Sequence, residues 1–175
     1  MLEILFPDEY LDSVHTIDFE RLYQEGYRGL IFDIDNTLVP HGAPADEQAI
    51  AFFQKLRRIG FRSCFLSNNR RERVESFNNP IGETFIEKAN KPALAGYRKA
   101  MDLLNTDKDN TIFIGDQIFT DVFGAKRAGL YTIMVKPVHP KEEIQIVLKR
   151  FLEKPILGYY HKKHADSEKK HVLMK

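Results

Sequence analysis

The sequence predicts one α/β domain of three layers, in which helices cover both faces of a central parallel sheet. Short apolar runs typical of buried strands alternate with segments of helical periodicity, and this alternation indicates βαβ units. A length of 175 residues suits one domain with a sizeable core. No apolar stretch approaches the roughly 18 to 20 residues that cross a bilayer, so we expect no membrane-spanning helix.

Strands are expected at short runs rich in apolar residues, because a strand covered on both faces buries both of its sides. The predicted strands are residues 30–34, 61–66, 84–86, 111–114 and 131–135. The run at 84–86 is the weakest of these. Its position still continues the alternation of strands and helices.

Helices are expected between the strands, where apolar residues recur every three or four positions. The predicted helices cover residues 46–59, 70–77, 92–104, 118–128 and about 140–151. Gly60 and Gly129 are suitable stops, and Pro92 suits a first helical turn. Phe151 is expected to face the core.

The charge is distributed unevenly along the chain. Residues 136–175 carry ten Lys or Arg and five Asp or Glu, whereas the remainder carries sixteen basic and twenty acidic residues. We expect a single domain over residues 1–158 and a basic, flexible tail over 159–175. The tail is either a solvated terminus or a surface for anionic phospholipid. The net acidic remainder argues against nucleic-acid binding.

Cys64 is the only cysteine, which excludes an internal disulfide and suits a small core residue in a reducing compartment. The N-terminus has neither a basic start nor a small-residue cleavage site, so we expect no signal peptide. These features favour a cytoplasmic setting, with peripheral contact at the inner membrane face left open by the basic tail.

Polar residues follow several predicted strands directly. Asp33 and Asp35 follow the first strand, Ser67 the second and Asp116 the fourth. The carboxyl ends of parallel strands share one edge of the sheet, and ligands bind outside that edge. We therefore expect these side chains to converge there, although Asp35 and the following Asn36 also suit a plain turn.

Other polar residues accompany this edge. Ser67 and Asn68 at a strand-to-helix turn suit a phosphate oxygen, and Ser67 equally suits a helix N-cap. Lys91 is held at a defined place by Pro92, where it would neutralise phosphate. Asp121 is either part of the site, a helix cap or a partner of Lys126.

In this order the segments resemble the haloacid dehalogenase (HAD) superfamily of phosphotransferases. The resemblance covers residues 28–136, and its details are similar to the small YqeG-like phosphatases of subclass III, which resemble mitochondrial and plastid phosphatidylglycerophosphate phosphatases. It implies a HAD-like Rossmannoid fold. The matching motif residues are Asp33, Asp35, Thr37, Ser67, Lys91, Gly115, Asp116 and Asp121.

The resemblance also implies roles. Asp33 would be the nucleophile that forms an aspartyl-phosphate, and Asp35 the general acid and then base. The phosphoryl oxygens would be held by Thr37, Ser67, Asn68 and Lys91. The Asp33 and Asp116 carboxylates with the Asp35 carbonyl would bind Mg²⁺, and Asp121 would support the site.

No inserted cap domain fits between the motifs, so the site suits a large substrate that brings its own cover. A phosphate ester is expected, with phosphatidylglycerophosphate as the candidate. The alternatives are a soluble metabolite such as a sugar phosphate or nucleotide, and a non-catalytic module that binds Mg²⁺ and a phosphorylated ligand. An oligomer neighbour would also cover the site. His41 and the histidines of the tail have no assigned role.

Overall fold

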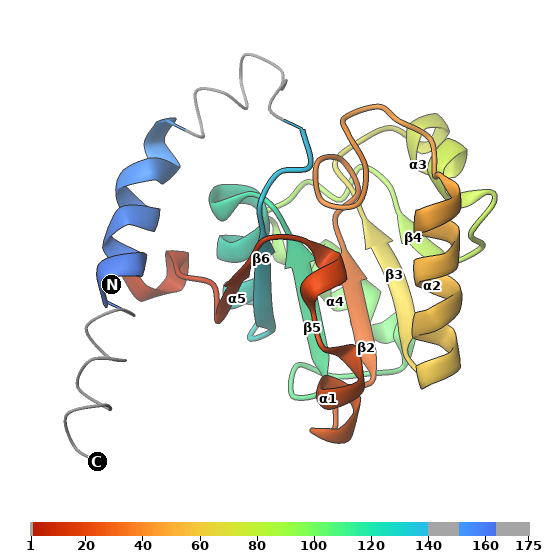
Figure 1. The fold of residues 1–175 in the computed structure, drawn as a ribbon, viewed down its shortest axis with the longest axis horizontal. Coiled ribbons are helices and arrows are strands. Elements are labelled where there is room, and N and C mark those ends of the chain that lie inside the picture. The colour runs from red at the N-terminus through yellow and green to blue at the C-terminus, as the bar shows by residue number, and fades with distance from the viewer. Residues whose placement is uncertain (1, 140–150, 164–175) are drawn as a thin grey trace.

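Six parallel strands form one sheet in the order β1-β6-β5-β2-β3-β4. The computed structural model describes residues 2–139 and 151–163 (Figure 1). The strands are β1 Glu9–Leu11, β2 Gly29–Phe32, β3 Arg62–Leu66, β4 Thr84–Ile86, β5 Thr111–Gly115 and β6 Tyr131–Val135. The predicted α/β fold with a central parallel sheet is therefore confirmed.

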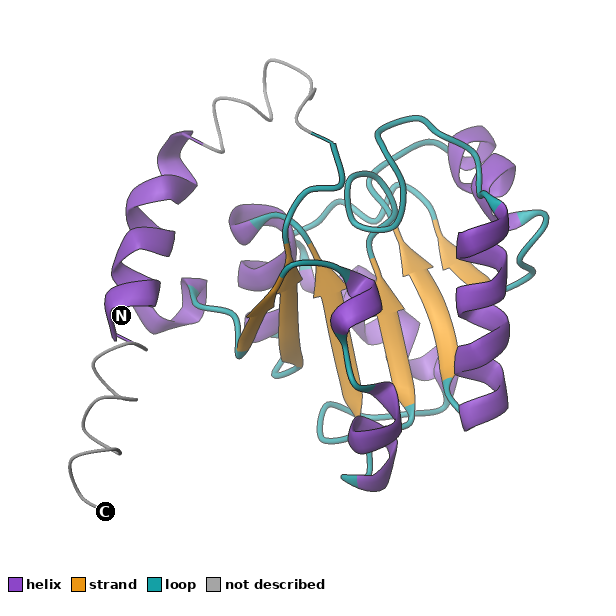
Figure 2. Cartoon of the chain, viewed as in Figure 1, coloured by secondary structure: helices purple, strands orange, loops and turns teal. Residues whose placement is uncertain are grey.

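Helices cover both faces of this sheet, as Figure 2 shows. The α-helices are α1 Phe19–Gln24, α2 Glu47–Ile59, α3 Arg71–Asn78, α4 Leu94–Leu104 and α5 Phe123–Arg127, and the shorter turns are η1 Leu2–Leu5, η2 Val14–Thr16 and the π-helix η3 Ile118–Val122. Residues 151–163 are also helical. Side chains of α1, α2 and α3 pack on one face, and those of α4 and α5 pack on the other.

Alternate residues of the central strand serve the two halves of the core. Phe32 packs against Phe53 of α2, with ring centroids 5.2 Å apart, while its neighbour Ile31 belongs to the opposite cluster with Tyr97 of α4. All four side chains are fully buried. Since successive side chains of a strand point to opposite faces, an uninterrupted apolar run is what a doubly covered strand requires.

Three features of the fold differ from the sequence expectation. The edge strand β1 and the helix α1 were not predicted, because each is too short to show a period. The helix expected over residues 118–128 begins as the π-helix η3 and becomes α5 at Phe123. The helix expected from Pro92 begins at Leu94.

The C-terminal helix packs against the start of the chain. The Phe6 ring lies 5.8 Å from that of Tyr159 and 5.9 Å from that of Tyr160, which is buried. The domain boundary expected after residue 158 therefore falls inside a packed helix. Phe151 was expected to face the core but is 69% exposed. The rest of the helix expected at 140–151, and the tail from residue 164, lie outside the described residues.

The two connections that could hold a cap domain are short. A loop alone joins β2 to α2, and the segment from Ser67 to Lys91 contains α3 and β4 and nothing larger. Within residues 2–139 the expectation of an uncapped site thus holds. No helix in the described part of the chain is long and apolar enough to cross a membrane.

Candidate active site

Asp33 stands at the carboxyl end of the central strand. Its N–H continues the sheet by donating to the Ile114 carbonyl of β5 at 2.9 Å. Its carboxylate accepts from Lys91 Nζ at 2.5 Å and lies 3.4 Å from the Thr37 hydroxyl. The residue is 8% exposed. Burial raises the pKa of Asp33 to about 6, and the Lys91 ammonium opposes that rise.

Lys91 is a buried cation shared by two carboxylates. Its Nζ donates to Asp33 and, at 2.8 Å, to Asp121. Burial by itself lowers the pKa of Lys91, but the carboxylates of Asp121 and Asp33 outweigh it and hold the pKa above its usual range. The two carboxylates therefore favour the charged form of the lysine.

Asn68 fixes the backbone of this lysine. The Asn68 Oδ1 accepts from the Lys91 N–H at 2.6 Å, and its amide donates to the Lys91 carbonyl at 3.1 Å. The sequence predicted that Asn68 binds phosphate. In the structure the Asn68 amide holds the Lys91 backbone through both its oxygen and its nitrogen.

Asp116 and Asp121 enclose the other side of Asp33. Asp116 is fully buried and accepts from the Thr37 hydroxyl at 3.1 Å. Asp121 accepts from the N–H groups of Asp116 at 3.3 Å and Gln117 at 3.1 Å. Asp121 thus holds the loop after β5 in place through these two hydrogen bonds. It pairs with Lys91 and not with Lys126, which binds another carboxylate.

Gly115 leaves the space that Asp121 needs to accept these hydrogen bonds. A Cβ at this position would lie 2.7 Å from the Asp121 carboxylate and 2.8 Å from its Cβ. Any larger residue would displace Asp121 from the two N–H groups and from Lys91. The Gly-Asp pair in the sequence therefore serves the close packing of the loop as well as the placement of Asp116.

Three carboxylates in this edge meet the requirements of a cation site. Asp33, Asp116 and Asp121 each offer an oxygen, and these oxygens lie within 4.8 Å of one another. These three buried carboxyl groups lie close to the ammonium group of Lys91, which donates to Asp33 and Asp121. A hard divalent cation with oxygen ligands, such as Mg²⁺, fits this donor set and charge. The sequence named Asp33, Asp116 and the Asp35 carbonyl; the additional carboxylate is that of Asp121.

Asp35 points away from this cluster. Its carboxylate accepts from the Gly42 N–H at 2.7 Å, the Asn69 amide at 2.5 Å and Arg73 Nη2 at 2.8 Å. The His41 Nδ1 lies 3.9 Å away. The two aspartates of the motif therefore have different surroundings: Asp33 faces buried carboxylates, and Asp35 faces cationic and amide donors.

Ser67 directly follows β3, the neighbour of β2, and is buried. Its hydroxyl accepts from the Asn69 N–H at 3.1 Å, in the loop before α3. Ser67 is not the N-cap of that helix, because α3 begins at Arg71 with Arg70 as its N-cap. Asn69 and Arg73 touch Asp35, yet sequence reasoning gave neither a definite role. The helical spacing of Arg73 resembles that of any solvated residue, so only the packing of α3 shows where it points.

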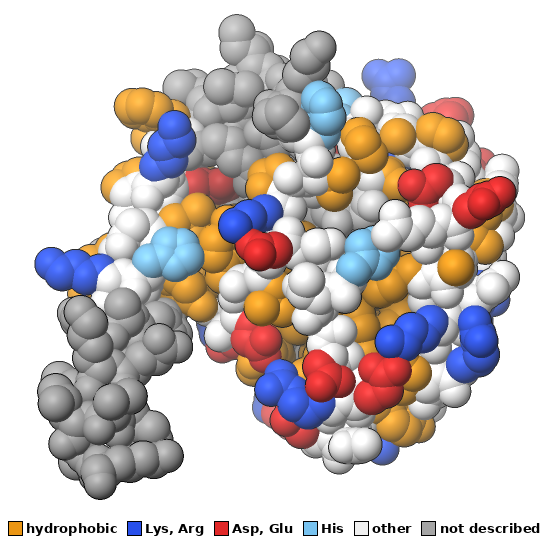
Figure 3. Space-filling view, viewed as in Figure 1, with side chains coloured by type: hydrophobic (Ala, Val, Ile, Leu, Met, Phe, Trp, Pro, Cys, Tyr) orange, Lys and Arg blue, Asp and Glu red, His pale blue; other side chains and the backbone are white. Residues whose placement is uncertain are grey.

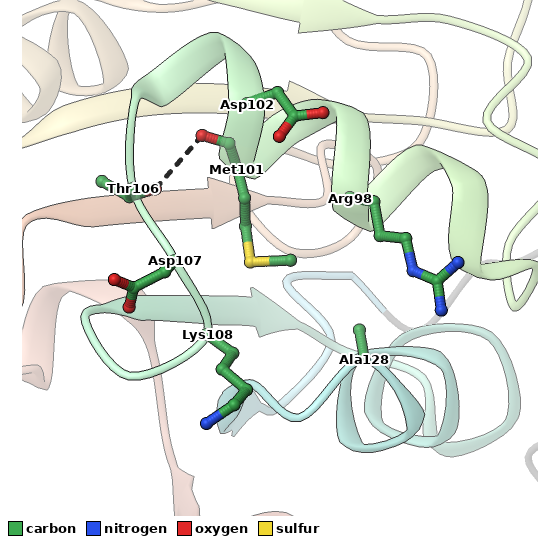
Figure 4. Close-up of a pocket in the computed structure, with 7 residues that line it drawn as sticks. All are labelled: Arg98, Met101, Asp102, Thr106, Asp107, Lys108 and Ala128. Carbon is green, nitrogen blue, oxygen red and sulfur yellow. Dashed lines mark hydrogen bonds between the residues drawn. The ribbon is translucent and has the colours of Figure 1, made fainter.

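A pocket of about 400 Å³ lies elsewhere on the molecule (Figure 4). It opens between the end of α4 at Met101 and Asp102, the loop before β5 at Lys108, and Ala128 after α5. These residues lie at the amino edge of the sheet, opposite the carboxylates. Both signs of charge line it, and its lining includes none of Asp33, Asp116 and Asp121.

Comparison with known proteins places the chain among phosphatases. The HAD-hydrolase-like family model matches residues 88–145. The chain is 35% identical over 165 residues to "Probable phosphatase YqeG" of Bacillus subtilis, covering 93% of this chain and 96% of that protein. It is 24% identical to phosphatidylglycerophosphate phosphatase 1 of Arabidopsis thaliana, over 94% of this chain but only 53% of the plant protein.

The fold is shared with more distant enzymes. The cobalt-bound deoxy-D-mannose-octulosonate 8-phosphate phosphatase of Haemophilus influenzae superposes with a TM-score of 0.51 at 15% identity, covering 62% of this chain and 68% of that one. The likeness to the bacterial phosphatase extends over nearly the whole of both chains. The chain therefore belongs to the YqeG-like phosphatases of the HAD superfamily.

Proposed function

We propose that this phosphatase is a Mg²⁺-dependent phosphomonoester hydrolase that acts through an aspartyl-phosphate on Asp33. One feature of the site supports this chemistry above all. The Asp33 carboxylate, held by Lys91 and beside the Thr37 hydroxyl, lies among Asp116 and Asp121 at the open edge of an uncapped sheet.

The reaction divides into two displacements at phosphorus. In the first, an Asp33 oxygen bonds to phosphorus, the bond from phosphorus to the ester oxygen breaks, and Asp35 gives the departing alkoxide a proton. In the second, Asp35 takes a proton from water, whose oxygen attacks phosphorus and releases phosphate and free Asp33. Acid and base catalysis of this kind contributes about 10²–10⁴-fold.

The remaining groups position the reacting atoms and neutralise the negative charge of the phosphoryl group. Lys91 offsets negative charge on the transferring phosphoryl group and orients Asp33, and Thr37 and Ser67 offer hydroxyls to its oxygens. Asp33 and Asp116, together with the Asp35 carbonyl or the Asp121 carboxylate, would hold Mg²⁺. When bound, the ion supplies positive charge that lowers the repulsion between the attacking carboxylate and a dianionic ester.

Hydrolysis of p-nitrophenyl phosphate tests this chemistry. Activity should require Mg²⁺ and disappear with EDTA, and Asp33→Asn should abolish turnover without loss of fold by circular dichroism. Asp35→Asn should slow turnover by about 10²-fold or more. Full activity in metal-free buffer would refute the Mg²⁺ requirement. Wild-type turnover of Asp33→Asn would refute the role of Asp33 as nucleophile.

Phosphatidylglycerophosphate is the substrate we propose. The similarity to the plant phosphatase supports it, as does an uncapped site, which admits a large headgroup. The alternative is a soluble metabolite. The specificity constant for the lipid in vesicles should exceed that for sugar phosphates and nucleotides, and a metabolite preferred by about tenfold would exclude the lipid.

Peripheral contact with an anionic membrane belongs to the same proposal. Phe151, Leu152 and Tyr159 on the C-terminal helix are 69%, 55% and 57% exposed, and Lys154 and Lys162 are exposed beside them. Figure 3 shows apolar and basic side chains next to one another over this helix. Binding to phosphatidylglycerol vesicles should weaken as salt rises, because salt screens such attraction. Salt-independent binding would contradict it.

A further inference from the structure

Arg73 on α3 contacts the Asp35 carboxylate, and the proposed reaction gives this arginine no role. Its side chain is 17% exposed, and its Nη2 and Nε lie 2.8 and 3.3 Å from Asp35 Oδ1. One edge of its guanidinium, formed by Nε and Nη2, is therefore bound to Asp35. The neighbouring Arg71 is different: its side chain is 60% exposed and pairs with Glu75 on the surface.

The other side of the Arg73 guanidinium lacks an acceptor. Nη1 is buried and has no hydrogen-bond partner among the residues that the structure describes. A buried donor without an acceptor costs about 1–3 kcal/mol, and more for a charged group. The site would therefore gain from an oxygen that arrives beside Arg73.

The place of Asp35 in the reaction identifies the source of that oxygen. A general acid lies within about 2.6–3.2 Å of the atom that it protonates, here the oxygen of the leaving alcohol. Arg73 is in hydrogen-bond contact with the same carboxylate. Groups next to Asp35 therefore border the leaving alcohol, while Lys91 borders the transferring phosphoryl group.

We infer that Arg73 is a specificity-determining residue, which binds a second anionic oxygen on the leaving alcohol of the substrate. This inference rests on the proposed function. The remaining Nη1 donor suits an anionic phosphodiester or carboxylate oxygen better than it suits a neutral hydroxyl, because the bond to an anion is charge-assisted. The preferred substrates would then be phosphate monoesters whose alcohol carries another anion close to the ester.

A pair of esters isolates this effect. Glycerol 2-phosphate and 2-phosphoglycerate share the ester position and differ in a hydroxymethyl or carboxylate group beside it. We expect the wild-type enzyme to favour the carboxylate ester and Arg73→Gln to lose about 10–100-fold more kcat/KM on it than on the neutral ester, chiefly through KM. Arg73→Lys should retain part of the preference, and Arg71→Gln, on the same helix, should retain all of it.

The same comparison separates recognition from support of Asp35. If Arg73 only positioned Asp35, Arg73→Gln would lower kcat on both esters by the same factor, and this result would overturn the inference. If the wild-type enzyme hydrolysed no ester, the proposed function would fail instead. Circular dichroism of the variant confirms that the fold is intact before the kinetics are compared.

The anion has two sources that share one chemistry, a lipid headgroup or a soluble ester. The headgroup of phosphatidylglycerophosphate can be offered in vesicles and as its water-soluble deacylated form. Equal losses of Arg73→Gln on both forms support recognition of the diester oxygen itself. A loss confined to vesicles would overturn the inference, since Arg73 would then contact the bilayer.

Discussion

Replacing Lys91 by Met should destabilise the protein strongly, because it removes the cation between two buried carboxylates. The Lys91 side chain is 3% exposed, and its partners Asp33 and Asp121 are 11% and 1% exposed. Breaking a buried ion pair from one side costs about 3–5 kcal/mol. For a domain of this size that lowers the unfolding temperature by roughly 6–20 °C.

The loss of stability caused by Lys91→Met should grow as pH rises. Burial raises the pKa of Asp33 from 3.8 to about 6, so between these values the folded state holds a proton that the unfolded chain has lost. The stability associated with Asp33 therefore falls as pH rises through this window. Lys91 limits that window by lowering the pKa of Asp33. Without Lys91 the window extends upward, and the variant continues to lose stability above pH 6.

Thermal unfolding in EDTA at pH 5 and pH 8, followed by circular dichroism, measures both effects. Lys91→Met/Asp121→Asn should recover part of the loss, since one of the stranded charges is removed. Lys108→Met is the matched control, because Lys108 pairs with Asp109 on the surface, and its unfolding temperature should match the wild type. An unfolding temperature of Lys91→Met equal to that of the wild type at pH 8 would refute the reasoning.

Three further predictions concern the packing around the site. Gly124→Ala should cost about 1–3 kcal/mol in denaturant unfolding, because the added Cβ would lie 2.7 Å from Tyr97 Cζ; an unchanged midpoint would show that the Tyr97 ring moves freely. Cys64 should resist iodoacetamide at pH 8 until the protein unfolds, because it is buried and burial raises its pKa to about 12; rapid labelling of native protein would contradict this. Glu153→Ala should cost about 1–3 kcal/mol by stranding the Ile118 N–H, now bound at 2.7 Å, whereas Glu153→Gln should retain stability; equal effects of the two variants would exclude this role.

The sequence by itself determined the layered fold and the edge of the sheet that carries the chemistry. Apolar runs such as Leu30-Ile31-Phe32 can be satisfied only where both faces of a strand are covered. Polar residues that follow such runs then lie along one edge of the sheet. Local pattern and the parallel direction of the strands therefore sufficed to place Asp33, Ser67 and Asp116 on that edge, and the strand order β5-β2-β3 makes them neighbours.

Short or exposed segments escaped this reasoning. β1 has three residues and α1 has six, so neither contains enough turns or alternations for a period to be read. The π-helix η3, which begins the helix expected over residues 118–128, was missed for a different reason. Its residues fit an α-helix equally well. The hydrogen bonds that Asp121 accepts from the N–H groups of Asp116 and Gln117 exist only once the loop after β5 has folded.

The tertiary structure alone decided which partners the charged residues take. Lys91 binds Asp121 across 30 positions, Arg73 binds Asp35 across 38, and Glu153 reaches Ile118 across 35. Such contacts depend on the register of neighbouring strands and on the direction in which a helix leaves the sheet. Local pattern shows that a residue is charged and where its element begins, but burial decides whether that charge meets water, a carboxylate or a substrate.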